Sequence, residues 1–116
     1  LGLVEAALND ASLNHVYFDI SWDEVAKYIV ATDKSVSESA NLINRFPQRF
    51  LFGTDVVAPS SAEMYYAVFD EYQPLWDALT PEASELVRKG NYERLFDEAR
   101  RKVRAWEAAN VKTQRR

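Results

Sequence analysis

Residues 49–55, Arg-Phe-Leu-Phe-Gly-Thr-Asp, constrain the fold of this chain more than any other segment. The apolar residues 50–52 are continuous rather than alternating, which is typical of a strand covered on both faces in a parallel sheet. Gly53 then allows the backbone to turn without a side chain in the way. The segment therefore predicts a short buried strand over residues 50–54 that carries the carboxylate of Asp55 at its C-terminal end.

The length and composition are sufficient for one packed domain. The chain has 116 residues, of which 47% are hydrophobic and 13% aromatic, so a core can form. No run approaches the roughly 20 consecutive apolar residues that cross a bilayer, and we expect no membrane partner. The absence of cysteine excludes disulfides and thiolate metal sites and is typical of a reducing compartment. We therefore expect a cytoplasmic protein.

The net charge of −4 conceals a basic C-terminal end, because residues 100–116 carry seven Lys or Arg against Glu107 alone. Cations near the end of a terminal helix favourably oppose the negative end of its dipole. Nucleic-acid binding is a weaker explanation, since such surfaces usually combine aromatic or glycine platforms with a basic overall charge. We therefore expect no nucleic-acid partner.

A second strand is expected before the first helices. Residues 13–20 are rich in β-forming side chains, and Ser21 has the spacing of a capping box with Glu24. Ser35 begins a second capping signature, and the helix that follows it should stop at Pro47. Two helical segments between two strands give a crossover long enough to make the strands parallel. The order predicts one βαβ unit.

The remainder of the chain is expected to be helical, with breaks that the sequence marks. Ser60 and Ser61 cap a helix that Pro74 interrupts, and Thr80 caps the next helix with proline at its first position. Gly90 is a candidate C-cap and Asn91 a candidate N-cap for the last helix. An apolar stripe follows along that last helix: Leu95, Ala99, Val103 and Trp106. The pattern predicts a helix-rich α/β fold with about five helices and two parallel strands.

Three segments, residues 15–22, 49–55 and 90–96, occur in one order and at one spacing. In that order they resemble the C-terminal part of the amidohydrolase-related family of metal-dependent (β/α)8 barrel enzymes, over about residues 3–106. The resemblance implies that the two strands are barrel strands seven and eight. It makes residues 1–110 the C-terminal part of such a barrel and leaves residues 111–116 as a basic tail that frays. The start without methionine agrees with a fragment of a longer protein.

The resemblance assigns a chemical role to Asp55. It implies that Asp55 is the strand-eight aspartate that contacts the metal or its bound water and accepts a proton. A divalent metal, zinc or manganese, lowers the pKa of bound water towards about 7, and a carboxylate beside it can take the proton and return it to a leaving group. The implied activity of the parent is hydrolysis of a C–N or C–O bond, or decarboxylation, of a small-molecule substrate.

The chain lacks most of the ligands that the family uses. The His-x-His pair of strand one and the ligands of strands five and six have no counterpart, because His15 is the only histidine. A catalytic zinc takes three protein ligands and an open position. We therefore expect this chain alone to bind no metal and to be inactive.

Each candidate residue also has a structural explanation. Asp55 can simply satisfy a turn at the end of its strand. Asp19, inside the first strand, should either face the barrel mouth or find a partner such as Arg45 or Arg49, and the partner is favoured. His15 should be structural, because it lies at the N-terminal end of its strand. Ser21, Thr54 and Asn91 lie near possible substrate positions, but Ser21 and Asn91 are expected to be caps first. The three tryptophans are expected to pack in the core: Trp22, Trp76 and Trp106.

The alternative function is a non-catalytic helical module for protein interaction or self-association. In either case the strands would present unpaired edges and an apolar face to solvent. We therefore expect a homodimer or a higher homo-oligomer.

Overall fold

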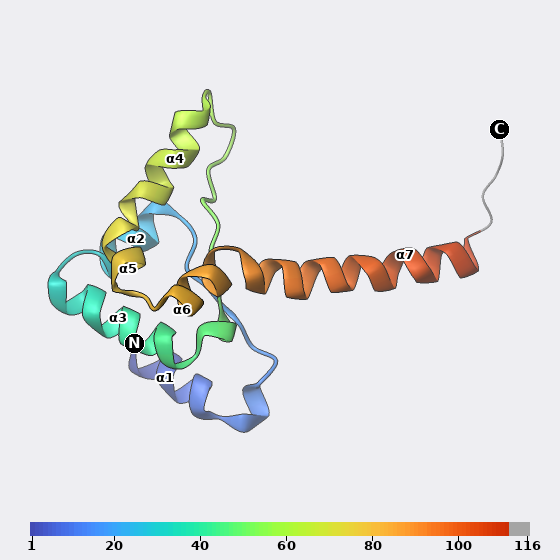
Figure 1. Ribbon diagram of the computed structural model, residues 1–116, viewed down its shortest axis with the longest axis horizontal. Helices are drawn as coiled ribbons and strands as arrows, with labels where there is room; N and C mark the ends of the chain where they lie inside the picture. Colours follow the sequence, from blue (N-terminus) through green and yellow to red (C-terminus); the bar gives the residue numbers. More distant parts are fainter. Residues whose placement is uncertain (112–116) are drawn as a thin grey trace.

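The computed structural model describes residues 1–111. Over this range the protein is a helix-rich α/β fold with seven α-helices and two short parallel strands in an open sheet. Figure 1 shows a body of helices around the strands and a final helix that projects away from it. The structure measures 59 × 42 × 24 Å, and the projecting helix lies along the longest dimension.

The helices and strands follow one another in a simple order. They are α1 (Gly2–Asn9), β1 (Phe18–Asp19), α2 (Asp23–Ile29), α3 (Asp33–Arg45), β2 (Phe50–Leu51), α4 (Ala62–Glu71), α5 (Gln73–Ala78), α6 (Pro81–Glu85) and α7 (Glu98–Asn110). Two 3₁₀ turns, η1 (Ala11–Leu13) and η2 (Pro47–Arg49), precede the strands. Two wide π-helical segments, η3 (Leu86–Gly90) and η4 (Glu93–Asp97), join α6 to α7. About five helices were expected, so that number was too low.

The βαβ unit is confirmed. The two strands pair in parallel, with Phe18 opposite Phe50 and Asp19 opposite Leu51, and α2 and α3 form the connection between them. Both strands are shorter than predicted. Before β1, backbone carbonyls bind a side chain instead of a neighbouring strand. The guanidinium of Arg49 donates to the carbonyl oxygens of Leu13 and Val16, at 2.6 Å each.

The core centres on the packing of α3 against α5, with β2 and the segment from α6 to η3 beside them. Phe52 continues the line of β2 and packs edge-on against Tyr72 and Trp76, with ring centroids 4.9 Å apart in both cases. Trp76 is buried as predicted, but Trp22 and Trp106 are 48% and 62% exposed. The prediction that all three tryptophans pack in the core was therefore wrong: Trp22 lies beside a surface hollow and Trp106 lies on the projecting helix.

The helix starts agree with the sequence only in part. Thr80 caps α6 as predicted, since its hydroxyl accepts a hydrogen bond from the backbone N–H of Ala83, and Pro74 does lie at the start of α5. The capping box of α3 exists, but its first residue is Thr32 and Ser35 is its second partner. Ser21 caps no helix, because α2 begins at Asp23.

The predicted break at Gly90 and Asn91 is absent. The chain stays helical from α6 through η3 and η4 into α7. Asn91 is fully buried, and its side-chain amide donates to the carbonyl oxygens of Pro47 and Phe50, at 2.7 and 2.8 Å. This residue is therefore an anchor between the long helical region and β2, not a helix cap.

Two further expectations concern the membrane and the C-terminal tail. Within residues 1–111 no helix has both the length and the apolar character required to span a bilayer. The tail was predicted to fray over residues 111–116, of which residues 112–116 lie outside the described residues.

Candidate functional site

The C-terminal ends of the two parallel strands meet at one edge of the sheet. This is the edge where parallel α/β folds place ligands, because the loops that leave neighbouring strands converge there. Here the loop after β1 and the loop after β2 line a hollow of about 410 Å³. The residues that line it are Asp19, Ser21, Trp22, Gly53 and Asp55.

Asp55 is exposed to solvent and lies four residues beyond the end of β2, whereas the sequence predicted it directly after the strand. It also lines a second hollow of about 420 Å³ that extends toward α4 and includes the half-buried Thr54 and the side chain of Met64. Asp55 therefore lies between the two hollows, and a molecule in either could contact its carboxylate. Two additional candidates from the sequence share these hollows with Asp55: Ser21 lines the first and Thr54 lines the second.

The backbone around the site is strained at two positions. Asp55 has φ = 51° and Trp22 has φ = 87°, both in the region that L-residues rarely adopt. Aspartate tolerates this conformation better than most residues do, whereas a tryptophan there needs support from its surroundings. Strained residues of this kind concentrate at functional sites, so the two outliers on one hollow make it the strongest candidate site among residues 1–111.

Gly53 allows the two loops to approach closely. A Cβ atom at this position would lie 3.2 Å from the hydroxyl oxygen of Ser21. Its φ is not positive, so other residues could adopt this backbone conformation. A glycine is favoured here because the loops after β1 and β2 approach closely. A side chain here would push the loop after β1 away from the loop after β2.

Asp19 does not pair with arginine, so that prediction was wrong. Arg45 instead forms an ion pair with Glu5, and Arg49 binds backbone carbonyls. The carboxylate of Asp19 accepts hydrogen bonds from the backbone N–H of Ser21, at 2.8 Å, and from its hydroxyl. Asp19 is exposed at the hollow, and its carboxylate is hydrogen-bonded within its own loop. Of the two carboxylates that line the hollow, only that of Asp55 has no hydrogen-bond donor within residues 1–111.

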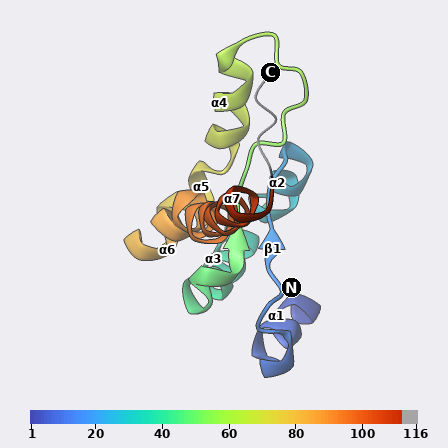
Figure 2. The same cartoon turned by 90° about the vertical axis from the view of Figure 1, so that its right-hand side faces the viewer.

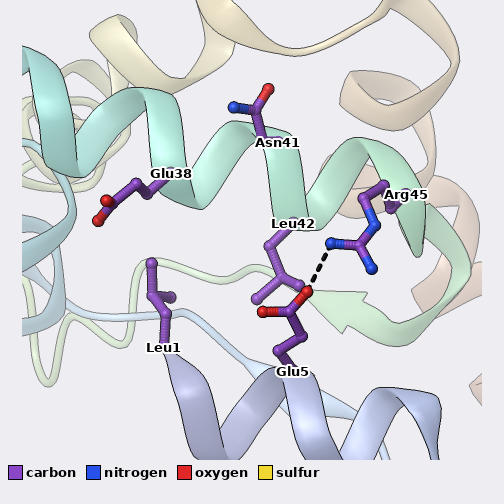
Figure 3. Close-up of a pocket in the computed structure, with 6 residues that line it drawn as sticks. All are labelled: Leu1, Glu5, Glu38, Asn41, Leu42 and Arg45. Carbon is purple, nitrogen blue, oxygen red and sulfur yellow. Dashed lines mark hydrogen bonds and ion pairs between the residues drawn. The ribbon is translucent and has the colours of Figure 1, made fainter.

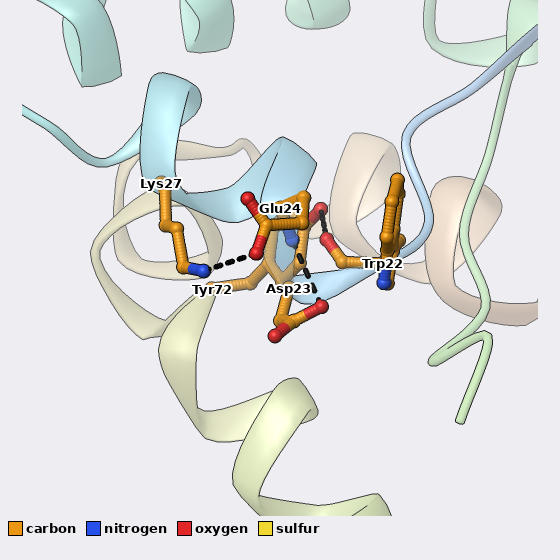
Figure 4. Close-up of polar contacts among 5 residues, drawn as sticks. All are labelled: Trp22, Asp23, Glu24, Lys27 and Tyr72. Carbon is orange, nitrogen blue, oxygen red and sulfur yellow. Dashed lines mark hydrogen bonds and ion pairs between the residues drawn. The ribbon is translucent and has the colours of Figure 1, made fainter. Parts of the chain in front are cut away.

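Tyr72, between α4 and α5, binds the backbone of the loop after β1 through its hydroxyl. Its fully buried hydroxyl lies within hydrogen-bond distance of the carbonyl oxygens of Ile20 and Trp22, the latter at 2.8 Å (Figure 4). Burial, followed by the negative charges of Asp19, Glu71 and Asp23, raises the pKa of the Tyr72 hydroxyl far above its ordinary value. The hydroxyl therefore stays protonated, and its single proton is shared between the carbonyl oxygens of Ile20 and the strained Trp22.

Sequence reasoning missed this contact. Tyr72 falls on the apolar face of its helical segment, so the sequence marks it as a core residue. No local pattern shows that its hydroxyl reaches Ile20 and Trp22, which lie 52 and 50 positions earlier in the chain. A buried tyrosine hydroxyl usually needs a partner, and this is the one signal that the sequence could have offered.

Two sequence candidates lie away from the hollow. His15 is exposed in the turn before β1, at the opposite end of the strand from Asp19. Asn91 contacts the backbone at the start of β2. Neither residue lines the strand-end hollow.

The residues present do not fit a metal ion on their own. Within residues 1–111 no three side chains of the types His, Cys, Asp and Glu are grouped closely enough to hold one. The hollow offers the carboxylates of Asp19 and Asp55, and the first already accepts two hydrogen bonds. A catalytic zinc needs three protein ligands, so the role of Asp55 as a metal ligand stays a prediction for a more complete protein.

A separate hollow of about 330 Å³ lies between α1 and α3 (Figure 3). Its main polar contact joins Arg45 to Glu5 at 2.6 Å, and both side chains are about half exposed. An exposed ion pair of this kind contributes at most about 1 kcal/mol. The pair holds α1 against α3, and the hollow brings together no group suited to catalysis.

We compared the chain with models of known protein families, with curated proteins and with solved structures, and none of the three comparisons found a match. The resemblance of its motifs to amidohydrolase-related enzymes therefore stays a prediction. The strand-end hollow and the exposed side chains of the molecule are therefore the features from which a function can be proposed.

Proposed function

We propose that this chain is the C-terminal part of an amidohydrolase-related, metal-dependent hydrolase, with Asp55 as the proton acceptor at the end of its last barrel strand. The reaction class is hydrolysis of a C–N or C–O bond, or decarboxylation, of a small molecule. One observation carries the proposal: Asp55 follows β2 and shares a hollow with the end of the parallel strand β1.

The open sheet supports the same proposal. A (β/α)8 barrel has eight strands and about 250 residues, whereas residues 1–111 contain two strands. In this proposal β1 and β2 are strands seven and eight, and the other strands belong to a preceding part of the same protein. The hollow would then be one sector of a larger cleft.

Asp55 is better suited to proton transfer than Asp19. The Asp19 carboxylate is engaged by Ser21, so it fixes the shape of its own loop. Asp55 is exposed and lines both hollows, so a water or substrate can reach its oxygens. In the parent, zinc or manganese would supply the activated water, and its ligands would come from outside this chain. This chain alone is proposed to bind no metal and to be inactive, and to reside in the cytoplasm.

The test uses the chain extended by its natural preceding coding sequence. Metal content is measured by elemental analysis, and activity is screened against amides, esters and carboxylic acids. Asp55→Asn should reduce activity by about 10²–10⁴-fold, the usual contribution of a general base, while circular dichroism stays unchanged. Asp19→Asn is the matched control and should retain most of the activity. The proposal fails if Asp55→Asn is fully active, or if the preceding sequence encodes no His-x-His segment and the extended protein holds no metal.

A second candidate function is a non-catalytic module for interaction or self-association. It is favoured by α7, which exposes large apolar side chains away from the body. This function needs neither Asp55 nor a metal. It predicts a homodimer or a higher homo-oligomer, which light scattering detects directly.

A further inference from the structure

The projecting helix α7 is an apolar surface with no partner in the body of the protein. None of its residues is buried, and Val103 and Trp106 are 54% and 62% exposed. At its start Phe96 is 51% exposed and stacks on Tyr92, with ring centroids 4.9 Å apart. Large apolar side chains gathered on an exposed face mark an interaction surface.

The spacing of these side chains is that of a helix pair. Ala99, Val103, Trp106 and Asn110 follow one another at intervals of four, three and four residues, which is the a/d spacing of a heptad. We call these four residues the α7 seam. On a helix they form one narrow stripe, and such a stripe packs against a second helix that runs nearly parallel or antiparallel to it.

We propose that the α7 seam pairs with the α7 seam of a second copy of this chain, in antiparallel orientation. The shape of the molecule excludes the parallel alternative. Figure 2 looks along α7 and shows α4, α1, α6 and α2 on different sides of its axis. Paired helices lie about 8–10 Å apart, so a parallel pair would force the two bodies into the same space. An antiparallel pair places the bodies at opposite ends.

Charge selects one register of the antiparallel pair. When Val103 faces the partner's Trp106, Ala99 faces the partner's Asn110, and Arg100 lies beside the partner's Glu107. Glu107 forms an ion pair with Arg104 of its own helix, and in this register it is shared with the partner's Arg100. Two-fold symmetry repeats every contact, so the pair contains two such Arg–Glu contacts and each Trp106 faces a smaller Val103. Flanking charges of this kind set the orientation of helix pairs.

The neighbouring register is disfavoured by the same charges. Sliding the two α7 helices past each other by one heptad, so that they overlap over a greater length, would place Arg100 beside the partner's Arg100. It would also place Lys102 beside the partner's Lys102. Like charges at these positions repel and act against the wrong pairing. The sequence of α7 therefore favours one antiparallel register over the next.

The α7 pairing specifies one surface for the second candidate function, and the hydrolase proposal does not require it. It uses no residue of the strand-end hollow, so a substitution in α7 leaves the hydrolase proposal untouched. It also differs from self-association through the strand edges, since α7 begins beyond the last strand.

The test measures the molar mass of the full chain by sedimentation equilibrium over a roughly hundredfold range of concentration, because mass action governs a dimer. The native chain should approach twice its monomer mass at high concentration. Arg100→Glu and Glu107→Arg should each weaken the dimer at least about tenfold, since each places like charges together. The double variant with both substitutions should restore it. Arg101→Glu is the matched control, because Arg101 lies on the far side of the helix and the dimer should be unchanged.

Orientation is tested by cross-linking, which is clean because the native chain has no cysteine. A mixture of the Ala99→Cys and Asn110→Cys variants should form a disulfide between the two variants under mild oxidation, and neither should cross-link efficiently to itself. Self-cross-linking of each variant would show a parallel pair and overturn the proposal. Three results of the sedimentation test would also overturn the proposal. The native chain could be a monomer at every concentration, or the double variant could stay monomeric while circular dichroism shows that it is folded. The third result is a dimer whose stability no α7 substitution changes.

Discussion

Removing the hydroxyl of Tyr72 should destabilise the protein by an amount that the structure allows us to estimate. In Tyr72→Phe the ring keeps its packing against Phe52 and Trp76, at centroid distances of 4.9 and 5.5 Å. The carbonyl oxygens of Ile20 and Trp22 lose their donor. Trp22 is 48% exposed, so water can replace the donor there, but the carbonyl of the buried Ile20 is left unpaired.

One buried acceptor without a partner costs about 1–3 kcal/mol, and we expect the free energy of unfolding to fall by about 1.5 kcal/mol. With a urea dependence of about 1.5 kcal/mol per molar, the midpoint of unfolding should fall by about 1 M. The matched control is Tyr28→Phe, because Tyr28 is 78% exposed and its loss should change stability by less than about 0.5 kcal/mol.

The mobility of the loop around Trp22 tests the reasoning as directly as the urea midpoint does. Trp22 owes its unusual backbone conformation to the loop that Tyr72 holds, so its fluorescence should report greater mobility in Tyr72→Phe before global unfolding begins. If Tyr72→Phe unfolds at the same urea concentration as the native chain, the hydroxyl does not hold this loop. The explanation of the strained Trp22 would then be wrong.

Three further predictions concern other parts of the fold. The stability gap between the native chain and Tyr72→Phe should narrow above pH 10, measured by urea unfolding, because the unfolded tyrosine loses its proton near its ordinary pKa of about 10 while the folded one has a raised pKa. Asn91→Ala should lower the free energy of unfolding by about 2–3 kcal/mol in urea, because it leaves the carbonyls of two residues before and within β2 unpaired. Arg49→Met should cost about 2–3 kcal/mol through two lost charge-assisted hydrogen bonds, whereas Arg45→Met, which removes an exposed ion pair, should cost less than about 1 kcal/mol by the same assay.

The sequence predicted those features that short-range patterns determine. The apolar run before Gly53 located β2, and the two helical segments between the strands predicted their parallel pairing, which the structure confirms. Asp55 lines the hollow near the strand ends, but it lies four residues beyond β2 and not at the end of the strand. Its chemical role is a separate matter, because that role depends on groups that residues 1–111 do not contain.

The wrong predictions have a common physical cause. Asn91 has the composition of a cap, but it binds carbonyls 44 and 41 residues away, so tertiary hydrogen bonds replace the local one. Arg49 makes the first strand start later than predicted, because it binds carbonyls before β1 that a neighbouring strand would use. Asp19 likewise finds its partner two residues away, in Ser21, and not in a distant arginine. Local propensity cannot show which of several possible partners a polar group finds.

The π-helical segment η4, between Asn91 and α7, determines where the projecting helix presents its apolar side chains. Each residue of an α-helix advances the chain by about 100° around the axis, and a π-helical turn accommodates one residue more than an α-helical turn. Because η4 lies between the anchor Asn91 and the seam, it fixes the rotational phase of the seam relative to the body. Deleting one residue between positions 92 and 98 would keep every seam side chain and turn the whole seam by about a quarter of a revolution toward a different face of the molecule.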